Sequence, residues 1–291
     1  MNRTVAPNLS KTYCSEIHSE SIVTFELMGD LEVAREVLGN PRDFVYRWNS
    51  FGAFGIIEVR GNDELADPQT LRRVLQLLLS KTAALEQAKC RVVSIHYSFF
   101  SSWTHRSIWL SAEEIDAFAR LNLPFTFSAN IFRSHNYPND EPQNFANLSY
   151  ETSVSLDVVI SESHFAEFEK LYGTKFLERK PEMATVTDKS LVHETRAEST
   201  TTTPVDFLTD YLKELAADMP AINAMTDPES NSLRLSCWTC FFGAFAQTTF
   251  PTDFFPFLKS LGIENFDISI TLDDYYLPVE TAEQDLWRDL K

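Results

Sequence analysis

Residues 233–271 read LRLSCWTCFFGAFAQTTFPTDFFPFLKSLGIENFDISIT, and residues 91–131 read RVVSIHYSFFSSWTHRSIWLSAEEIDAFARLNLPFTFSANI. In both stretches apolar residues alternate, then recur at helical spacing, then alternate again, which predicts a strand, a short helix and a second strand. Aligned on their paired phenylalanines, the stretches match at apolar positions: Phe99 with Phe241, Phe118 with Leu258, and Phe125 with Phe266. The shared order of elements indicates an internally duplicated architecture.

The residues that precede these stretches repeat in the same way. An alternating strand pattern leads into a helical stripe that ends at glycine, at 21–39 in the first half and at 153–173 in the second. Each half then has a longer helix that opens with a capping residue and a proline, at 67–68 and at 203–204. Proline suits the first helical position because its missing N–H would be unpaired there.

The third helix of the first half opens with a capping box formed by Ser111 and Glu114. We expect a further strand at 103–109 and a matching one at 245–250. One sheet with helices on one face is the economical arrangement for such a half. The sequence therefore predicts an α+β fold of two tandem similar domains, each a mainly antiparallel sheet with helices packed on one face.

The domain boundaries follow from composition. Residues 134–147 are rich in Pro, Asn and acid, which is typical of a linker, and residues 175–203 are polar and Thr-rich. We expect the latter to be a long loop with a short strand near 190–194, and whether it is ordered or functional is left open. The predicted divisions are a flexible N-terminal arm at 1–20, repeat one at 21–133, a linker at 134–150, and repeat two with an acidic C-terminal segment at 151–291.

Net charge is the strongest compositional signal. The 291 residues contain 25 Lys and Arg against 42 Asp and Glu, a formal charge of −17. Residues 145–291 hold 11 basic and 25 acidic residues, so the excess lies in the second half. Such a surface repels phosphate backbones, which argues against direct nucleic-acid binding, and it attracts basic protein partners. The alternative is that the charge serves solubility alone.

The sequence also indicates a compartment. No run of about 18 apolar residues occurs, and residues 1–20 lack the apolar core of a secretory signal. The four cysteines show no framework spacing, which fits a reducing environment. We expect a cytoplasmic protein without membrane contact, of unknown oligomeric state.

The sequence contains no motif that indicates a particular reaction. Cys237 and Cys240 have the CxxC spacing of redox and zinc sites, but they lie in a predicted strand, and no second cysteine pair or histidine pair completes a metal shell. The six histidines are scattered, and His96 falls in a strand. No nucleophile elbow, phosphate loop or dinucleotide fingerprint occurs. We therefore predict no catalytic residue, no cofactor and no metal site.

One segment after the last strand combines acid with tyrosine, a mixture that favours contact with basic protein surfaces. The alternative is that its tyrosines pack the terminal segment onto the second domain. The candidate partner-binding residues are Asp273, Asp274, Tyr275, Tyr276 and Glu280.

The blocks at 25–39, 68–85 and 110–132, the last reading LSAEEIDAFARLNLPFTFSANIF, resemble an uncharacterised bacterial α+β domain family, over about 20–133 and more faintly over 152–272. The resemblance implies a non-enzymatic protein, because members of that family recur among immunity proteins of polymorphic toxins. It supplies no catalytic residues. The second half departs from the pattern by its long polar loop.

Together these points predict an immunity protein that neutralises a cognate secreted antibacterial toxin. The toxin would be a nuclease delivered by a type VI or contact-dependent system, and the protein would occupy or distort its basic active-site region. Two alternatives stay open: a non-enzymatic scaffold or phage-derived inhibitor module, and an enzyme with its site between the repeats. The sequence identifies neither the toxin nor the contact face.

Overall fold

The structure is a computed structural model that describes residues 20–39, 46–51, 54–61, 68–101, 105–131, 150–178, 189–199, 203–226, 232–240 and 245–273. The strands are β1 (Glu20–Met28), β2 (Tyr46–Phe51), β3 (Phe54–Gly61), β4 (Arg91–Ser101), β5 (His105–Leu110), β6 (Phe125–Ile131), β7 (Tyr150–Ile160), β8 (Leu177–Glu178), β9 (Lys189–Ser199), β10 (Ser232–Cys240), β11 (Phe245–Phe250) and β12 (Phe266–Asp273). The helices are α2 (Leu31–Leu38), α3 (Gln69–Gln87), α4 (Ala112–Leu121), α5 (Glu162–Tyr172), α6 (Pro204–Leu215), α7 (Met219–Met225) and α8 (Phe254–Ser260).

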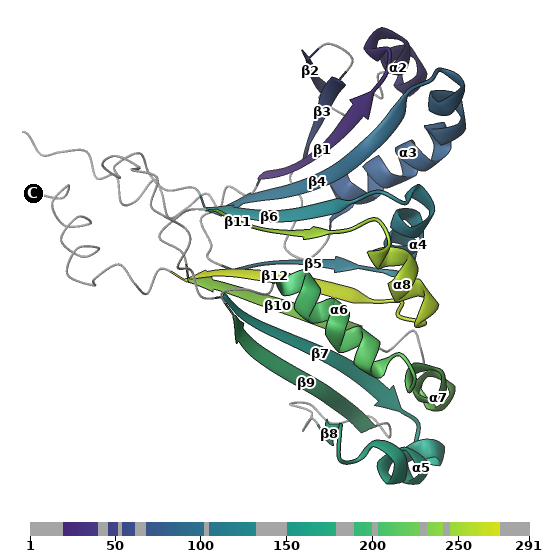
Figure 1. Ribbon diagram of the computed structural model, residues 1–291, viewed down its shortest axis with the longest axis vertical. Coiled ribbons are helices and arrows are strands. Elements are labelled where there is room, and N and C mark those ends of the chain that lie inside the picture. Colours follow the sequence, from purple (N-terminus) through teal and green to yellow (C-terminus); the bar gives the residue numbers. More distant parts are fainter. Residues whose placement is uncertain are drawn as a thin grey trace, which may run out of the picture.

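The strands form two six-stranded sheets of matching order, β11-β6-β4-β1-β3-β2 and β5-β12-β10-β7-β9-β8 (Figure 1). Neighbouring strands are antiparallel except β4 with β6 and β10 with β12, which are parallel. Four strands of each sheet, β4-β1-β3-β2 and β10-β7-β9-β8, have the order of a split β-α-β unit of the ferredoxin-like kind. The predicted α+β class is confirmed.

The halves exchange one strand each. β5 comes from the first half but pairs with β12, where Ile108 is in register with Ile268. β11 comes from the second half but pairs with β6, where Thr248 is in register with Phe127. The sequence predicted both strands within their own halves. Because β1 and β6 already occupy the two edges of β4, β5 cannot lie beside the strand that precedes it.

The core is continuous across the two sheets. Buried residues of both form one hydrophobic cluster. Helices α4 and α8 meet between the sheets, where Phe118 and Phe255 stack with ring centroids 4.5 Å apart. On β5, the buried guanidinium of Arg106 lies 5.0 Å from the ring centroid of Phe99 on β4. Burial lowers the Arg106 pKa to about 10, which still leaves it charged at neutral pH.

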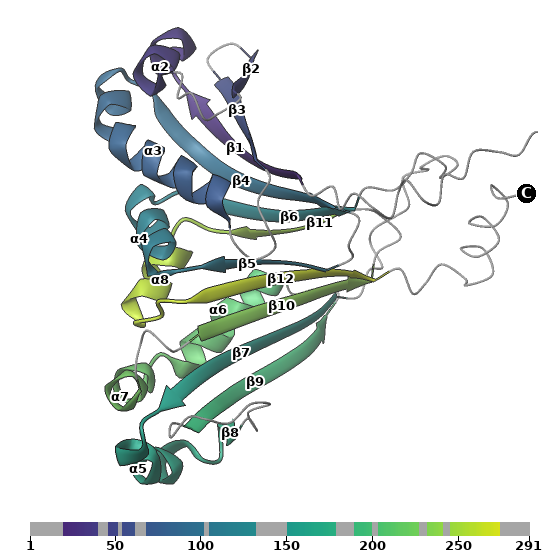
Figure 2. The ribbon, with the colours of Figure 1, turned by 180° about the vertical axis from the view of Figure 1, so that it is seen from behind.

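The two sheets carry their long helices on opposite sides of the molecule. Helix α6 lies in front of its sheet in Figure 1, whereas α3 lies in front of its sheet in the reverse view of Figure 2. Helix α3 packs on β1, β3 and β4, and α6 packs on β7 and on the exchanged strand β11. Strands β4, β6, β10 and β12 all end at the same end of the molecule (Figures 1 and 2).

Several local predictions are confirmed at the helix starts. Thr203 caps α6, with Pro204 at the first helical position. The capping box of Ser111 and Glu114 opens α4. The sequence did not predict the cap of α2, where the Asp30 carboxylate accepts hydrogen bonds from the backbone N–H groups of Glu32 and Val33. Strand β2 and helix α7 were not predicted.

The expected long loop at 175–203 is wrong over much of its length. Strand β9 covers eleven residues, not the five expected, and β8 pairs with it. His193 and Thr195 interrupt the apolar alternation, so the pattern is weak. The strand forms because β7 pairs with all eleven of its residues, so tertiary pairing outweighs the local signal.

The strand exchange predicts how the chain responds to cleavage between its halves. We expect a chain cut at a protease site inserted at 134–147 to remain one species, because β5 and β11 hold each half within the other's sheet. Size-exclusion chromatography before and after cleavage measures this, with the denatured digest as the control for complete cutting. Separation of two native fragments would contradict the exchange.

Candidate partner-binding surface

The predicted partner-binding segment starts at the end of β12. Asp273 is the last residue of that strand and is in register with Cys240 of β10. Asp274, Tyr275, Tyr276 and Glu280 lie outside the described residues. The structure therefore fixes where the segment leaves the second sheet, at the end where the parallel strands finish, and the role of these residues stays a prediction.

The acidic excess of the second half is also present when only the described residues are counted. The described residues from 150 to 273 include 16 Asp or Glu against 7 Lys or Arg, whereas those from 20 to 131 include 10 of each sign. Within the described ranges, the second half is therefore net negative and the first half is net neutral. A basic partner approaching the molecule is attracted to the second half.

Helix α6 presents carboxylates to solvent. Asp206, Asp210 and Glu214 are exposed at four-residue intervals on one face, opposite the face that buries Leu208 and Leu212. The Lys213 ammonium lies 3.1 Å from the Asp210 carboxylate, but both side chains are more than half exposed. Such an exposed ion pair contributes little to the free energy of folding, and it leaves the carboxylates accessible to a partner.

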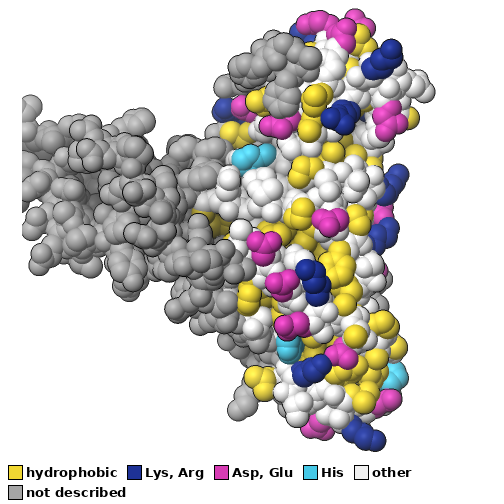
Figure 3. Space-filling view, in the orientation of Figure 1, with side chains coloured by type: hydrophobic (Ala, Val, Ile, Leu, Met, Phe, Trp, Pro, Cys, Tyr) yellow, Lys and Arg dark blue, Asp and Glu magenta, His cyan; other side chains and the backbone are white. Residues whose placement is uncertain are grey.

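Exposed carboxylates continue on α5 at Glu162, Glu167 and Glu169. On the face shown in Figure 3, acidic side chains are interspersed with basic and apolar ones. The negative potential is therefore spread over the helices of the second half and is not gathered in one pocket. Among the described residues, no three His, Cys, Asp or Glu side chains are placed to hold a metal ion.

His96 takes part in a hydroxyl cluster on the face of the first sheet opposite the one that buries Ile95 and Tyr97. Its Nε2 lies 3.0 Å from the Ser128 Oγ and 3.3 Å from the Ser98 Oγ, and the Ser128 hydroxyl donates to Ser98 at 2.9 Å. Burial lowers the His96 pKa, against an opposing effect of the Glu26 charge. Ser128 is fully buried. Because a substrate cannot reach that hydroxyl, we interpret the cluster as structural.

His193 occupies the opposite kind of position, inside the layer between the second sheet and α6. Its Nδ1 lies 2.8 Å from the Tyr211 hydroxyl, which donates to the His193 carbonyl at 3.0 Å. The ring also packs on Phe176. Burial lowers the His193 pKa, and the Lys175 charge acts in the same direction. These contacts join β9 to α6 and hold the His193 ring half-buried.

The cysteine pair that has redox spacing falls within a strand, as expected. Cys237 and Cys240 lie in β10 three positions apart, so the two positions belong to opposite faces of the sheet. Cys90 is buried and reduced, and its thiol donates to the Asp30 carbonyl at 3.2 Å.

No family model matches this chain. No curated protein matches it either. A solved structure that does match is a protein proposed to be a glycine cleavage system transcriptional repressor, at 10% identity. The match covers 80% of this chain and 98% of that one, with a TM-score of 0.16, which is too low to carry an inference about fold or function.

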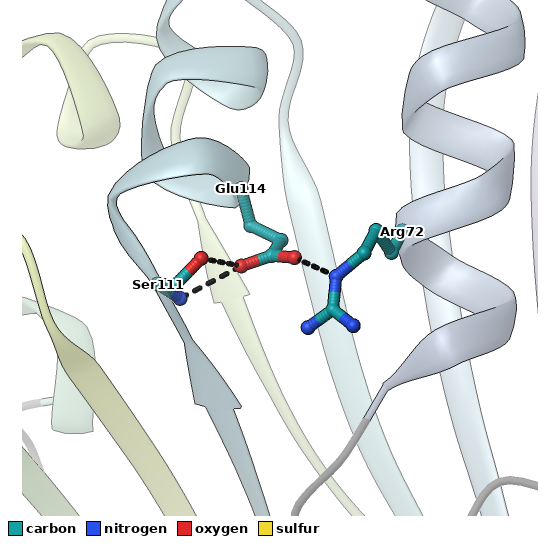
Figure 4. A network of polar contacts seen from close by, with 3 residues as sticks. All are labelled: Arg72, Ser111 and Glu114. Carbon is teal, nitrogen blue, oxygen red and sulfur yellow. Dashed lines mark hydrogen bonds and ion pairs between the residues drawn. The ribbon is translucent and has the colours of Figure 1, made fainter.

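Two contacts that sequence reasoning missed lie on α4. The Arg72 guanidinium of α3 donates to the buried carboxylate of Glu114, which also accepts from the Ser111 hydroxyl and, at 2.8 Å, from the Ser111 N–H (Figure 4). Asp116 pairs with Lys259 of α8, and that hydrogen bond lowers the Asp116 pKa. The sequence predicts that the acidic run complements the helix N-terminus. It gives no signal for partners on other helices.

None of the described helices is long and apolar enough to span a membrane.

Proposed function

We propose that this protein is a cytoplasmic, non-enzymatic immunity protein that binds a cognate secreted antibacterial toxin, a nuclease, and neutralises it. The observation that carries the proposal is the division of charge, because acidic residues outnumber basic ones 16 to 7 across the described second half. The exposed carboxylates of α6 belong to this acidic half.

The mechanism is steric and electrostatic. A nuclease cleft is basic because it holds the phosphates of its substrate, so carboxylates of an acidic protein can occupy or flank the cleft in their place. The net charge of −17 accelerates the encounter with such a surface. Tyr275 and Tyr276 would supply the apolar contact area that long-range attraction does not provide. The continuous core gives these groups a rigid base.

The histidines support a binding role over an enzymatic one. His96 hydrogen-bonds the buried hydroxyl of Ser128, and His193 faces Tyr211 in the interior. Burial lowers the pKa of both rings, which favours the neutral form at physiological pH. Both imidazoles are half-buried and engaged in these contacts within the fold.

Immunity proteins are usually encoded beside their toxins, so the product of the neighbouring gene is the toxin to test by charge neutralisation. We expect the triple variant Asp206→Asn, Asp210→Asn, Glu214→Gln to associate with that toxin on the order of tenfold more slowly at low salt, with a weaker salt dependence. A second triple variant, Asp273→Asn, Asp274→Asn, Glu280→Gln, tests the terminal segment in the same way. Stopped-flow association rates and survival of toxin-expressing cells are the measurements.

The matched control removes three exposed carboxylates from the first half, Glu32→Gln, Glu36→Gln and Glu86→Gln. It should associate at a rate close to that of the unmodified protein, since these groups lie outside the acidic half. The proposal fails if the neighbouring gene product neither binds the protein nor kills unprotected cells, or if the control slows association as much as the α6 variant does.

A further inference from the structure

The outer edge of the second sheet is largely uncovered within the described residues. Strand β9 is eleven residues long and pairs with β7 over its whole length. On its other side, β8 pairs with only Leu191 and Val192. Residues 193–199 of β9 thus have no described strand beside them, and the neighbouring Leu177 of β8 is 69% exposed.

In the first sheet, the strand that corresponds to β9 is β3, and it is paired on both sides over most of its length. There β2 pairs with six residues of β3, from Phe54 to Val59, which leaves only Arg60 and Gly61 beyond it. The two sheets have the same strand order but differ at this one edge. An uncovered edge displays unpaired backbone N–H and C=O groups, and these can pair with a strand from another chain.

The free stretch lacks several of the features that prevent such pairing, and charged side chains are the one that it retains. Edge strands are commonly protected by proline, lysine or a β-bulge. Residues 193–199, HETRAES, contain neither proline nor lysine, and the pairing of β9 with β7 proceeds without a register shift. A regular strand of this kind is a competent template for one more antiparallel strand.

The charges along the edge favour one occupant. His193 faces α6, so the alternating positions 194, 196 and 198 belong to the other face, where the sequence places Glu, Arg and Glu. A second copy paired antiparallel about Thr195 sets Arg196 opposite Glu194 of the other copy, twice by symmetry. Pairing about Ala197 sets it opposite Glu198 instead. Pairing about Arg196 would oppose like charges and is disfavoured.

We infer that β9 is a self-association edge, at which a second copy of this chain adds its own β9 antiparallel and joins the two second sheets across a twofold axis. The interface is isologous, and both copies keep their helices on the same side of the joined sheet. The axis passes through Thr195 or Ala197. The alternating charges fix the register and reject strands that lack the complementary pattern.

A charge-swap pair tests this inference on the full chain. The variant Arg196→Glu makes the three alternating positions acidic, and the double variant Glu194→Lys, Glu198→Lys makes them basic. Each homodimer then opposes like charges, whereas an equimolar mixture opposes unlike charges at these positions. A pairing of a few backbone residues is a small interface, so we expect a dissociation constant of about 10–100 µM for the unmodified chain.

Sedimentation velocity and light scattering across that concentration range give the result. The inference requires dimer in the unmodified chain, monomer in each variant and heterodimer in the mixture. The control variant Glu167→Lys, Glu169→Lys makes the same change in net charge on α5 and should still dimerise, and circular dichroism verifies folding of every variant. A monomeric unmodified chain, a dimeric Arg196→Glu variant, or a mixture of folded variants that stays monomeric would each overturn the inference. These outcomes are independent of toxin binding.

Discussion

Replacement of Phe255 by alanine should lower the free energy of unfolding by about 3–5 kcal/mol, the range measured when a fully buried phenylalanine leaves a cavity. The side chain is fully buried on α8. Its ring centroid lies 4.5 Å from that of Phe118 on α4, 6.0 Å from that of Phe125 on β6 and 6.0 Å from that of Phe250 on β11. The cavity would therefore open where elements of both halves meet.

Because the core is continuous, the loss should affect both sheets together. Chemical denaturation should show a single transition at a lower midpoint, with fluorescence and circular dichroism coinciding. Leu171→Ala on α5 is the control, since that side chain is 52% exposed and its truncation should change stability by less than about 0.5 kcal/mol. A Phe255→Ala protein that unfolds in two separate steps would show that the halves are independent after all.

The second large effect is expected at Glu114. Its carboxylate is 1% exposed and accepts from the backbone and hydroxyl of Ser111 and from the Arg72 guanidinium (Figure 4). Glu114→Ala removes half of a capping box and leaves the Arg72 cation without this partner. Since the Arg72 side chain is 37% exposed, water screens part of that loss, and we expect about 2–3 kcal/mol in total.

The adjacent Glu113 provides the matched control for Glu114. It lies in the same first turn of α4 but is exposed. Glu113→Ala should cost a few tenths of a kcal/mol at most, through the helix dipole. Thermal denaturation of the two variants measures the difference. Equal losses would mean that the contribution of Glu114 comes from the helix dipole alone and not from Ser111 and Arg72.

Glu114 illustrates how far sequence reasoning reaches at a single residue. Ser111 and Glu114 are three positions apart, so the capping box is a local pattern and the sequence predicts it. Arg72 is 42 residues away from Glu114 along the chain. Nothing in the local sequence indicates which side chain of another helix will reach a given carboxylate, because that depends on how α3 and α4 pack.

The strand pairs show the same limit. Alignment of the two halves matches Ile95 with Cys237, yet β4 pairs Ile95 with Phe125, whereas β10 pairs Leu233 with Phe266. The rows Phe25–Ile95–Phe125 and Leu156–Leu233–Phe266 occupy equivalent places in the two sheets, so Ile95 corresponds to Leu233. The alignment on the paired phenylalanines is therefore wrong by four residues for β10. An even error keeps the same face of each strand toward the core, so the apolar alternation fits either alignment and only the strand pairs decide between them.

Only part of the candidate partner-binding surface could be predicted from the sequence. The charge division between the halves is a property of composition, and the described residues retain it. The position of Asp273 at the end of β12 required the structure. The residues that follow, from Asp274 to Glu280, lie outside the described residues, and their contact with a partner stays a prediction.

By itself, the sequence determined the α+β class, the strand–helix–strand order of each half and most helix starts, because each depends on residues that are near one another in the chain. Only the tertiary structure decided that β5 and β11 change sheets, that β9 is a full strand and that Arg72 meets Glu114. These outcomes depend on which strand edges and helix faces the other elements leave free. Hydrophobic periodicity along the chain does not encode which elements will pack together.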